Sequence, residues 1–357
     1  MNRRTFSNSG CCHILAVGTA TSDVSYSQEE LLNLFQIDDR RVKSVFLNSH
    51  IARRFLTLPP VQPDGTRRTE TQGELLEKHR ALGVEIGARA VQFCLDQAKA
   101  KSEDVRFLCC VSTTGLLTPG FSALLSHEMK LSHDCARLDI VGMGCNAGLN
   151  GLNAVASWAN SNPNELAVMV CIEVCSAAYV FDDTMRSAVV NSLFGDGAAA
   201  VAVLARPDPC DAPAILKFSS LLIPDTLKAM RYDWDDTHGK FSFFLDRQVP
   251  YVVGAHSEQV VDRLLKSFHL HRRDISHWVV HGGGKKVIDA IMVNLGLTRH
   301  DMRHTVAVLR DYGNLASGSF LFSYKRLLEE GTVNAGDYGV LMSMGPGSTI
   351  ETALVQW

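Results

Sequence analysis

The feature of this sequence that most constrains its fold is an internal duplication, in which one order of apolar segments and turns occurs twice. The segments of the first half are SEDVRFLCCVSTTG (102–115), DCARLDIVGMGCNAG (134–148), LAVMVCIEV (166–174) and GDGAAAVAVLA (195–205). Those of the second half are HRRDISHWVVHGGG (271–284), HTVAVLRDYGNLASG (304–318), YGVLMSMGPG (338–347) and STIETALVQW (348–357). Their apolar runs are nearly continuous, as in strands buried on both faces. The duplication therefore predicts two similar α/β units packed together, at 1–208 and 209–357.

Helical segments separate the predicted strands. They are expected at 72–99, 146–159, 259–268, 285–295 and 315–329. An N-terminal strand, HILAVGTATS, precedes a helix whose start carries a capping pattern at Ser27 and Glu30. In this scheme Cys145 and Asn314 occupy equivalent places, each at the first turn of a helix after a buried strand, and His281 ends a strand. We expect these three side chains to meet where strand ends face helix starts.

Composition limits the class of protein. The chain has 357 residues, of which 46% are hydrophobic, enough to bury a large core. A net charge of −3 and the lack of a basic stripe argue against a nucleic-acid surface. No apolar run approaches the roughly 20 residues that a membrane span needs, and the N-terminus lacks a signal-peptide core. The sequence therefore predicts a cytoplasmic protein with no nucleic-acid or membrane partner.

The ten cysteines are scattered, without a CxxC pair or the spacing of a zinc site, so no metal is expected. Most lie in apolar runs such as FLCCV, where cysteine is a small buried hydrophobe. Cys145 is the candidate exception, because a helix start favours the thiolate through the helix dipole and free N–H groups. Gly142, Gly144 and Gly148 would let an acyl group approach, and the Cys145 N–H could stabilise an oxyanion. The alternative is a cysteine in a tight turn.

His281 and Asn314 each allow two interpretations. His281 follows an apolar run and precedes three glycines, so it is either the base that pairs with Cys145 or a structural histidine. Asn314 either caps its helix or donates its amide to a carbonyl oxygen. HGGGKK is not a phosphate loop, because the GxxxxGK spacing and a following Ser or Thr are missing.

Four further motifs carry a family resemblance over almost the whole chain. They are FGDGAAAVAVL (194–204), VVHGGGKKVIDAI (279–291), LRDYGNLASGSFLF (309–322) and YGVLMSMGPGSTIETALVQW (338–357). In this order they resemble the type III polyketide synthases, the chalcone-synthase-like branch of the thiolase fold. The resemblance implies an α/β thiolase fold with a duplicated, five-layered αβαβα architecture, and an acyltransferase that forms carbon–carbon bonds.

The resemblance also implies roles for individual residues. Cys145 matches the nucleophile that accepts the acyl group, and His281 with Asn314 matches the pair that decarboxylates malonyl-CoA and stabilises the enolate. Phe194 and Phe243 match two phenylalanines between the CoA tunnel and the cavity. The other substrate-binding positions that it implies are Thr113, Thr114, Thr118, Ala316, Gly345, Pro346 and Gly347.

The family resemblance extends to CoA and to a partner subunit. Arg41 falls where the family holds CoA phosphates, although two other basic positions of the family are Ser44 and Asn48 here. The segment Thr118-Pro119 matches one that reaches across a dimer interface, which implies a homodimer. No metal or redox cofactor is implied, since loss of carbon dioxide drives each extension.

Within the family, the segment 287–331 is most similar to bacterial 3,5-dihydroxyphenylacetyl-CoA synthases of antibiotic biosynthesis, which supply dihydroxyphenylglycine. Ala316 stands where plant members have serine, and Asn146 where they have an aromatic residue, so an aromatic starter is not expected. The resemblance implies malonyl-CoA as starter and extender, ring closure to 3,5-dihydroxyphenylacetyl-CoA or its acid, and helper enzymes of the enoyl-CoA-hydratase type.

Several alternatives stay open. They are a type III synthase with another acyl-CoA starter, a β-ketoacyl-carrier-protein synthase III, a Cys–His thioester hydrolase, and a non-catalytic partner subunit. A biosynthetic thiolase is disfavoured because it needs a late second cysteine, whereas the last one here is Cys210. A two-histidine ketoacyl synthase would need histidine in place of Asn314.

Overall fold

The computed structural model describes residues 11–63, 67–178, 185–206 and 211–357. Its main feature is a mixed nine-stranded sheet with the order β11-β12-β13-β8-β1-β7-β6-β4-β5. The strands are β1 (Cys11–Ala20), β4 (Val105–Ser112), β5 (Ala136–Val141), β6 (Leu166–Glu173), β7 (Gly197–Arg206), β8 (Ala214–Leu222), β11 (His277–Val280), β12 (Tyr338–Gly345) and β13 (Thr349–Gln356). Five strands come from the first half and four from the second, and the single pair His13↔Ala214 joins β1 to β8.

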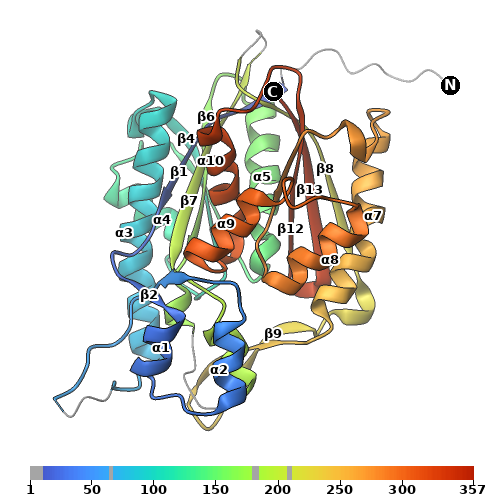
Figure 1. Cartoon of the computed structure of the whole chain (residues 1–357). Helices are drawn as coiled ribbons and strands as arrows, with labels where there is room; N and C mark the ends of the chain where they lie inside the picture. The colour runs from blue at the N-terminus through green and yellow to red at the C-terminus, as the bar shows by residue number, and fades with distance from the viewer. Residues whose placement is uncertain (1–10, 64–66, 179–184, 207–210) are drawn as a thin grey trace.

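The helices form three layers around the two halves of this sheet (Figure 1). They are α3 (Gln72–Ala98), α4 (Phe121–Glu128), α5 (Ala147–Ser161), α7 (Val249–Lys266), α8 (Lys285–Leu295), α9 (Arg303–Tyr312) and α10 (Ser319–Glu330). The first two pack on strands of the N-terminal half, and α7 packs on β8 and β13 with α8 against it. Between them, α5 and α10 contact strands of both halves. The predicted αβαβα layering is confirmed.

The predicted helices are all present, with shifted ends. The helix α7 begins at Val249, ten residues before its predicted start, and α10 begins at Ser319, because residues 316–318 form a separate 3₁₀ turn. The predicted capping box is confirmed at α1 (Gln28–Leu34). The Ser27 N–H donates to Glu30 Oε2 (2.7 Å), and the Glu30 N–H donates to Ser27 Oγ (3.1 Å).

One predicted strand is wrong. The segment HTVAVLR (304–310) lies inside the helix α9. His304, Thr305, Val308 and Leu309 are buried, whereas Val306 is 43% exposed, so the buried positions follow a helical period rather than a continuous apolar run. The C-terminal half consequently contributes four strands among the described residues, and its Asn314 follows a helix rather than a strand.

The two central helices approach closely where α5 begins. A Cβ added to Gly148 would lie 2.3 Å from the carbonyl oxygen of Ser317 and 2.6 Å from the Phe320 ring. The prediction that Gly148 makes room for an acyl group is therefore wrong. This glycine makes room for the other half of the protein, and thereby fixes the turn before α5 against the turn before α10.

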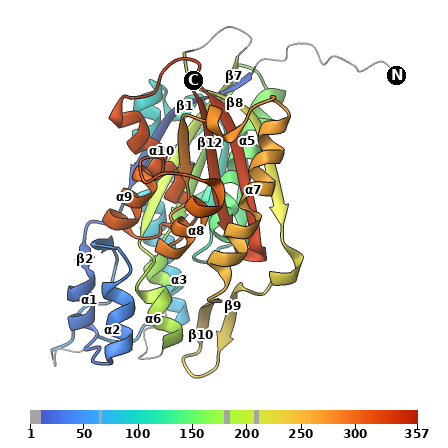
Figure 2. The same ribbon diagram turned by 45° about the vertical axis from the view of Figure 1, so that its right-hand side comes forward.

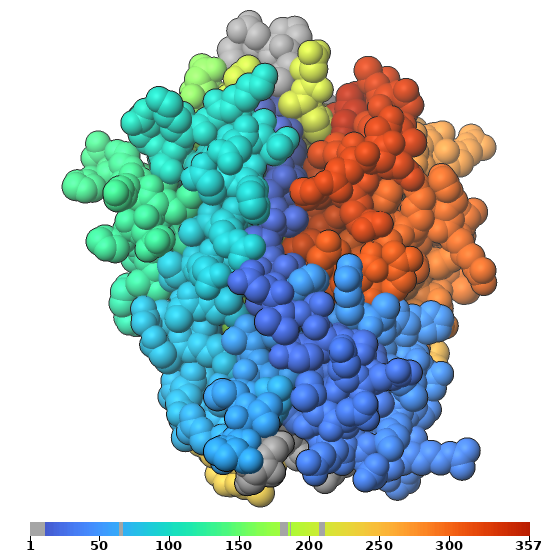
Figure 3. All heavy atoms as spheres, turned by 60° about the vertical axis from the view of Figure 1, so that its left-hand side comes forward, coloured from blue at the N-terminus to red at the C-terminus, as the bar shows by residue number. Residues whose placement is uncertain are grey.

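The smaller elements gather at one end of the molecule (Figure 2). They are β2 (Ser25–Ser27), α1, α2 (Arg40–Leu47), β3 (Arg53–Phe55), α6 (Met185–Asn191), β9 (Met230–Asp235) and β10 (Lys240–Leu245). Figure 3 shows the N-terminal segment, in blue, across the lower part of one face between the cyan and red regions. The strands β9 and β10 pair with each other as a hairpin outside the main sheet. In the described part of the chain, no helix has the length and apolarity needed to cross a bilayer.

Candidate active site

A cavity of about 290 Å³ lies where both halves meet the β9–β10 hairpin. Seven residues predicted at the site line it: Thr113, Thr114, Cys145, Phe194, Phe243, Ala316 and Pro346. They come from segments up to 233 residues apart in the chain, counting from Thr113 to Pro346. The duplication and the hairpin therefore bring most of the predicted substrate-binding residues together.

Four other predicted residues lie outside this lining. Thr118 and Arg41 are exposed at the surface. Gly345 and Gly347 flank the lining residue Pro346 and act through the backbone. A Cβ on Gly345 would lie 2.8 Å from the Cys145 nitrogen, and Gly347 has a left-handed φ of 76°. The 345–347 turn thus packs directly against the backbone of the candidate nucleophile.

Cys145 lies in a single 3₁₀ turn, Gly144–Asn146, immediately before α5, which confirms its prediction at a helix start. Gly142 and Gly144 have φ values of 78° and 73°, a conformation that glycine adopts without strain. A Cβ on Gly144 would lie 2.1 Å from Pro346 Cδ. Gly144 is therefore required by its neighbour, whereas Gly142, with no atom within 4 Å of an added Cβ, borders open space in the cavity.

Burial determines the charge state of Cys145 and His281. It raises the pKa of the Cys145 thiol, with a further increase from the negative charge of Glu173, and these effects outweigh the bond from the backbone N–H. Burial also lowers the pKa of His281 to about 4. The prediction that the helix start keeps Cys145 ionised in the resting site is wrong, because desolvation is larger than the helix-start effect. Both side chains rest in their neutral forms.

His281 follows β11 and is 2% exposed. Its N–H donates to the Met342 carbonyl (2.8 Å), which extends the β11–β12 pairing by one residue. Its Nδ1 is buried without a hydrogen-bond partner among the described residues. A Cβ on Gly283 would lie 3.3 Å from His281 Nε2, so the glycine-rich turn leaves space beside the ring.

Asn314 caps the 3₁₀ turn Ala316–Gly318 through Oδ1, which accepts the Ala316 N–H (2.8 Å). The predicted capping role is confirmed, and the amide nitrogen is the donor left for a substrate. Its backbone pairs with the segment before β7, where the Asn314 N–H donates to Leu193 O (2.8 Å) and Asn314 O accepts from Gly195 (3.0 Å). Asn314 and His281 are 2% exposed and lie outside the cavity lining.

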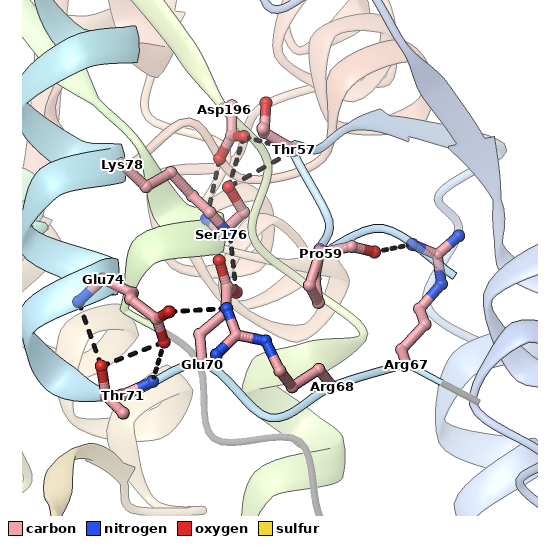
Figure 4. A network of polar contacts seen from close by, with 10 residues as sticks. All are labelled: Thr57, Pro59, Arg67, Arg68, Glu70, Thr71, Glu74, Lys78, Ser176 and Asp196. Carbon is pink, nitrogen blue, oxygen red and sulfur yellow. Dashed lines mark hydrogen bonds and ion pairs between the residues drawn. The ribbon is translucent and has the colours of Figure 1, made fainter. Parts of the chain in front are cut away.

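The GDG segment holds Phe194 in place. Fully buried Asp196 accepts bonds from the Ser176 N–H (2.8 Å), the Ser176 hydroxyl (2.7 Å) and the Thr57 N–H (3.0 Å), as Figure 4 shows. Burial raises the pKa of Asp196 to about 6. Arg54 Nη1 donates to the Phe194 carbonyl (2.7 Å). The Phe194 ring meets Phe243 edge-on at 5.9 Å, so the two predicted phenylalanines are neighbours.

Sequence reasoning missed Glu173, the most deeply buried acid beside the cavity. It accepts bonds from the Thr113 N–H (3.0 Å) and hydroxyl (2.9 Å), and from the Ser317 N–H (3.3 Å) and hydroxyl. Burial raises the pKa of Glu173 to about 7. Its signal in the sequence is a single carboxylate in the otherwise apolar run LAVMVCIEV.

Two further lining residues were also missed. Cys175, interpreted from sequence as a small buried hydrophobe, lines the cavity as a second thiol, and burial raises its pKa. Tyr232 comes from the β9–β10 hairpin, which the sequence analysis did not predict. Within the described residues, no three histidine, cysteine or acidic side chains cluster as a metal site requires.

Comparisons with known proteins agree with this geometry. Residues 1–207 match the N-terminal domain of chalcone and stilbene synthases, and residues 217–357 match the C-terminal domain. The chain is 63% identical over 349 residues to a 3,5-dihydroxyphenylacetyl-CoA synthase of Streptomyces toyocaensis, covering 96% of this chain and 90% of the relative. It is 62% identical to one of Amycolatopsis orientalis, covering 96% and 92%. The crystal structure of 1,3,6,8-tetrahydroxynaphthalene synthase from Streptomyces coelicolor superposes with a TM-score of 0.88 at 27% identity, over 97% and 99% of the two chains. The chain therefore belongs to the chalcone and stilbene synthase family of type III polyketide synthases.

Proposed function

We propose that this synthase makes 3,5-dihydroxyphenylacetyl-CoA, or the free acid, with malonyl-CoA as both starter and extender. The observation that carries the proposal is the high identity, along almost the whole chain, to relatives named for that product. The cavity volume of about 290 Å³ supports it, because ligand cavities typically span about 300–1,000 Å³ and this one is at the small end. A small starter fits that space better than an aromatic one.

In the proposed mechanism Cys145 accepts the first acyl group. Because the thiol and the His281 imidazole are both neutral at rest, attack on the thioester carbonyl is coupled to transfer of the thiol proton to His281. The same proton then protonates the departing CoA thiolate. The backbone N–H of Cys145, at a helix start, stabilises the tetrahedral oxyanion.

Extension uses the amide of Asn314 and the ring of His281. A second malonyl-CoA loses carbon dioxide, and the electron pair of the broken bond forms an enolate whose oxygen accepts a bond from each of these donors. The enolate carbon attacks the thioester at Cys145 and displaces its sulfur. After three extensions the eight-carbon chain closes by an internal carbon–carbon condensation that releases water, and the ring aromatises. Helper enzymes of the enoyl-CoA-hydratase type would complete that step.

We also propose that the enzyme is a homodimer, paired through the edge strand β5. Most of its residues are exposed, and Leu138 (36%) and Val141 (47%) are apolar. Leu116 (70%) and Thr118, in the segment expected to reach a partner, are exposed as well. Exposed Arg41 at the start of α2 is available for CoA phosphates.

Light scattering tests the dimer. Val141→Arg on β5 should give a monomer, whereas Val293→Arg, at a position 81% exposed on α8, should leave the mass unchanged. Two variants of equal mass would contradict pairing through β5.

Incubation of the purified protein with malonyl-CoA as sole substrate, followed by mass spectrometry, tests the function. We expect 3,5-dihydroxyphenylacetyl-CoA or its acid. Carbon dioxide and acetyl-CoA alone would indicate another starter. Condensation only with a carrier-protein thioester would indicate a ketoacyl synthase III, and thioester hydrolysis without a carbon–carbon bond would indicate a hydrolase.

A further inference from the structure

The β9–β10 hairpin places one aromatic ring in the cavity wall. Tyr232, on β9, lies opposite Phe243 of β10 in the antiparallel register, and the two rings are 5.2 Å apart at 60°. Phe243 in turn meets Phe194 from the main body of the protein. Tyr232 therefore continues the aromatic wall that the two predicted phenylalanines begin, on the side of the cavity formed by the hairpin.

The hydroxyl end of Tyr232 crosses from the hairpin to the end of β4. It donates a hydrogen bond to the carbonyl oxygen of Thr113 (3.3 Å). Thr113 is itself fixed, because its N–H and its hydroxyl both donate to Glu173. Burial and the nearby charges of Cys175, Glu173 and Cys145 raise the pKa of the Tyr232 phenol, which places the hydroxyl near the candidate nucleophile. The ring is thus held at both ends.

This ring separates the cavity from solvent. Tyr232 is 42% exposed, although it also lines the cavity with Cys145, so one side of the ring faces outward and the other inward. The hairpin that carries it is hydrogen-bonded as a separate two-stranded sheet, so the main sheet does not set the position of this wall. The phenol bond to Thr113 links it to the body of the protein.

A chain that grows on Cys145 adds two carbons at each extension inside a space of fixed size. Protein interiors are close-packed, so extension stops when the next unit would overlap the wall. We propose that Tyr232 is the residue that limits the number of extensions, by closing the cavity at the hairpin. This inference rests on the proposed polyketide activity and adds the residue that determines chain length.

The test compares the products of three variants after incubation with malonyl-CoA. Tyr232→Ala removes the ring and should give products longer than wild type by one or more two-carbon units. Tyr232→Phe keeps the ring and removes only the bond to Thr113, so the main product should keep its length. Trp234→Ala is the matched control. It removes an aromatic ring from the same strand, but Trp234 is 52% exposed, packs on Phe241 at 5.2 Å and lies outside the lining.

Mass spectrometry counts the two-carbon units in each product, and circular dichroism checks folding. If Tyr232→Ala does not fold, Tyr232→Leu keeps an apolar wall of smaller volume and should also lengthen the product. Unchanged length in a folded Ala or Leu variant would overturn the inference, as would the same lengthening in Trp234→Ala. A wild-type enzyme that makes no polyketide from malonyl-CoA contradicts the proposed function instead, so the two failures are distinguishable.

Discussion

The carboxylate of Glu173, at the end of β6, accepts a hydrogen bond from the backbone N–H of Ser317, which belongs to the other half of the chain (3.3 Å). The Ser317 hydroxyl donates to the same oxygen, and Thr113 donates twice to the other oxygen. One fully buried carboxylate therefore joins the two halves of the duplication beside the cavity. Four donors offset part of the cost of burying it.

Replacing Glu173 should change how stability depends on pH. Its folded-state pKa of about 7 lies above the roughly 4.3 of an unfolded glutamate. The folded state therefore binds the proton more tightly, and this contribution to stability is complete below about pH 4 and lost as the pH rises through 7. Glu173→Gln does not titrate, and its NH₂ must face a pair of donors. We expect the variant to be less stable than wild type at pH 5 and the gap to narrow toward pH 8.

Thermal melting of both proteins from pH 5 to 8 measures this gap. Effects of other titrating groups, such as His281, are common to both proteins and cancel in the difference. Glu128→Gln, at an exposed position, should show no such trend. A gap independent of pH would mean that Glu173 is ionised throughout this range.

The contact between the two central helices predicts the effect of a methyl group. Gly148→Ala should lower the free energy of unfolding by about 1–3 kcal/mol, because the new Cβ would lie 2.3 Å from Ser317 O. Gly73→Ala in α3 meets nothing within 4 Å and should leave stability unchanged or raise it by up to about 1 kcal/mol. Urea unfolding of the two variants checks the contrast, and equal changes would contradict the packing argument.

Cys145→Ala should abolish the acyl-enzyme. Intact-protein mass spectrometry after mixing with malonyl-CoA should show an acyl adduct on the wild type and none on the variant, and formation of the aromatic product should slow. Cys175→Ala is the control, since it removes the other thiol that lines the cavity and should leave the adduct in place. An adduct that persists in Cys145→Ala and disappears in Cys175→Ala would transfer the nucleophile to Cys175.

Two variants separate the capping and chemical roles of Asn314. Asn314→Asp keeps the oxygen that accepts the Ala316 N–H but lacks the amide donor, so it should fold normally and decarboxylate malonyl-CoA roughly 100-fold more slowly. Asn314→Ala loses both groups and should also lose about 1 kcal/mol of stability. Release of carbon dioxide measures the first effect and thermal melting the second. A wild-type rate in Asn314→Asp would leave Asn314 as a cap only.

The sequence was sufficient for the strands and helices whose pattern is unambiguous, such as β6, α5 and α8. It failed at α9, because HTVAVLR was interpreted as a continuous apolar run, although buried and exposed positions there follow a helical period. It did not predict the β9–β10 hairpin, whose strands depend on each other rather than on the main sheet, and Tyr232 was missed with it.

For the site, the motifs identified Cys145 and its neighbours in the cavity, but not the charge state of the thiol. That state depends on how completely distant segments exclude water, which local sequence does not encode. Glu173 was missed for the same reason, since its four donors come from Thr113 and Ser317, 60 and 144 residues away.

The replacement of a strand by α9 makes the two ends of the sheet unlike. At one end β5 offers unpaired N–H and C=O groups, whereas at the other end β11 is fully buried and contacts α9 and α10. A ribbon with one open edge can join one further copy of itself and then has no edge left. Pairing of this kind ends at two chains, whereas a sheet open at both ends could add copies without limit and form a fibre.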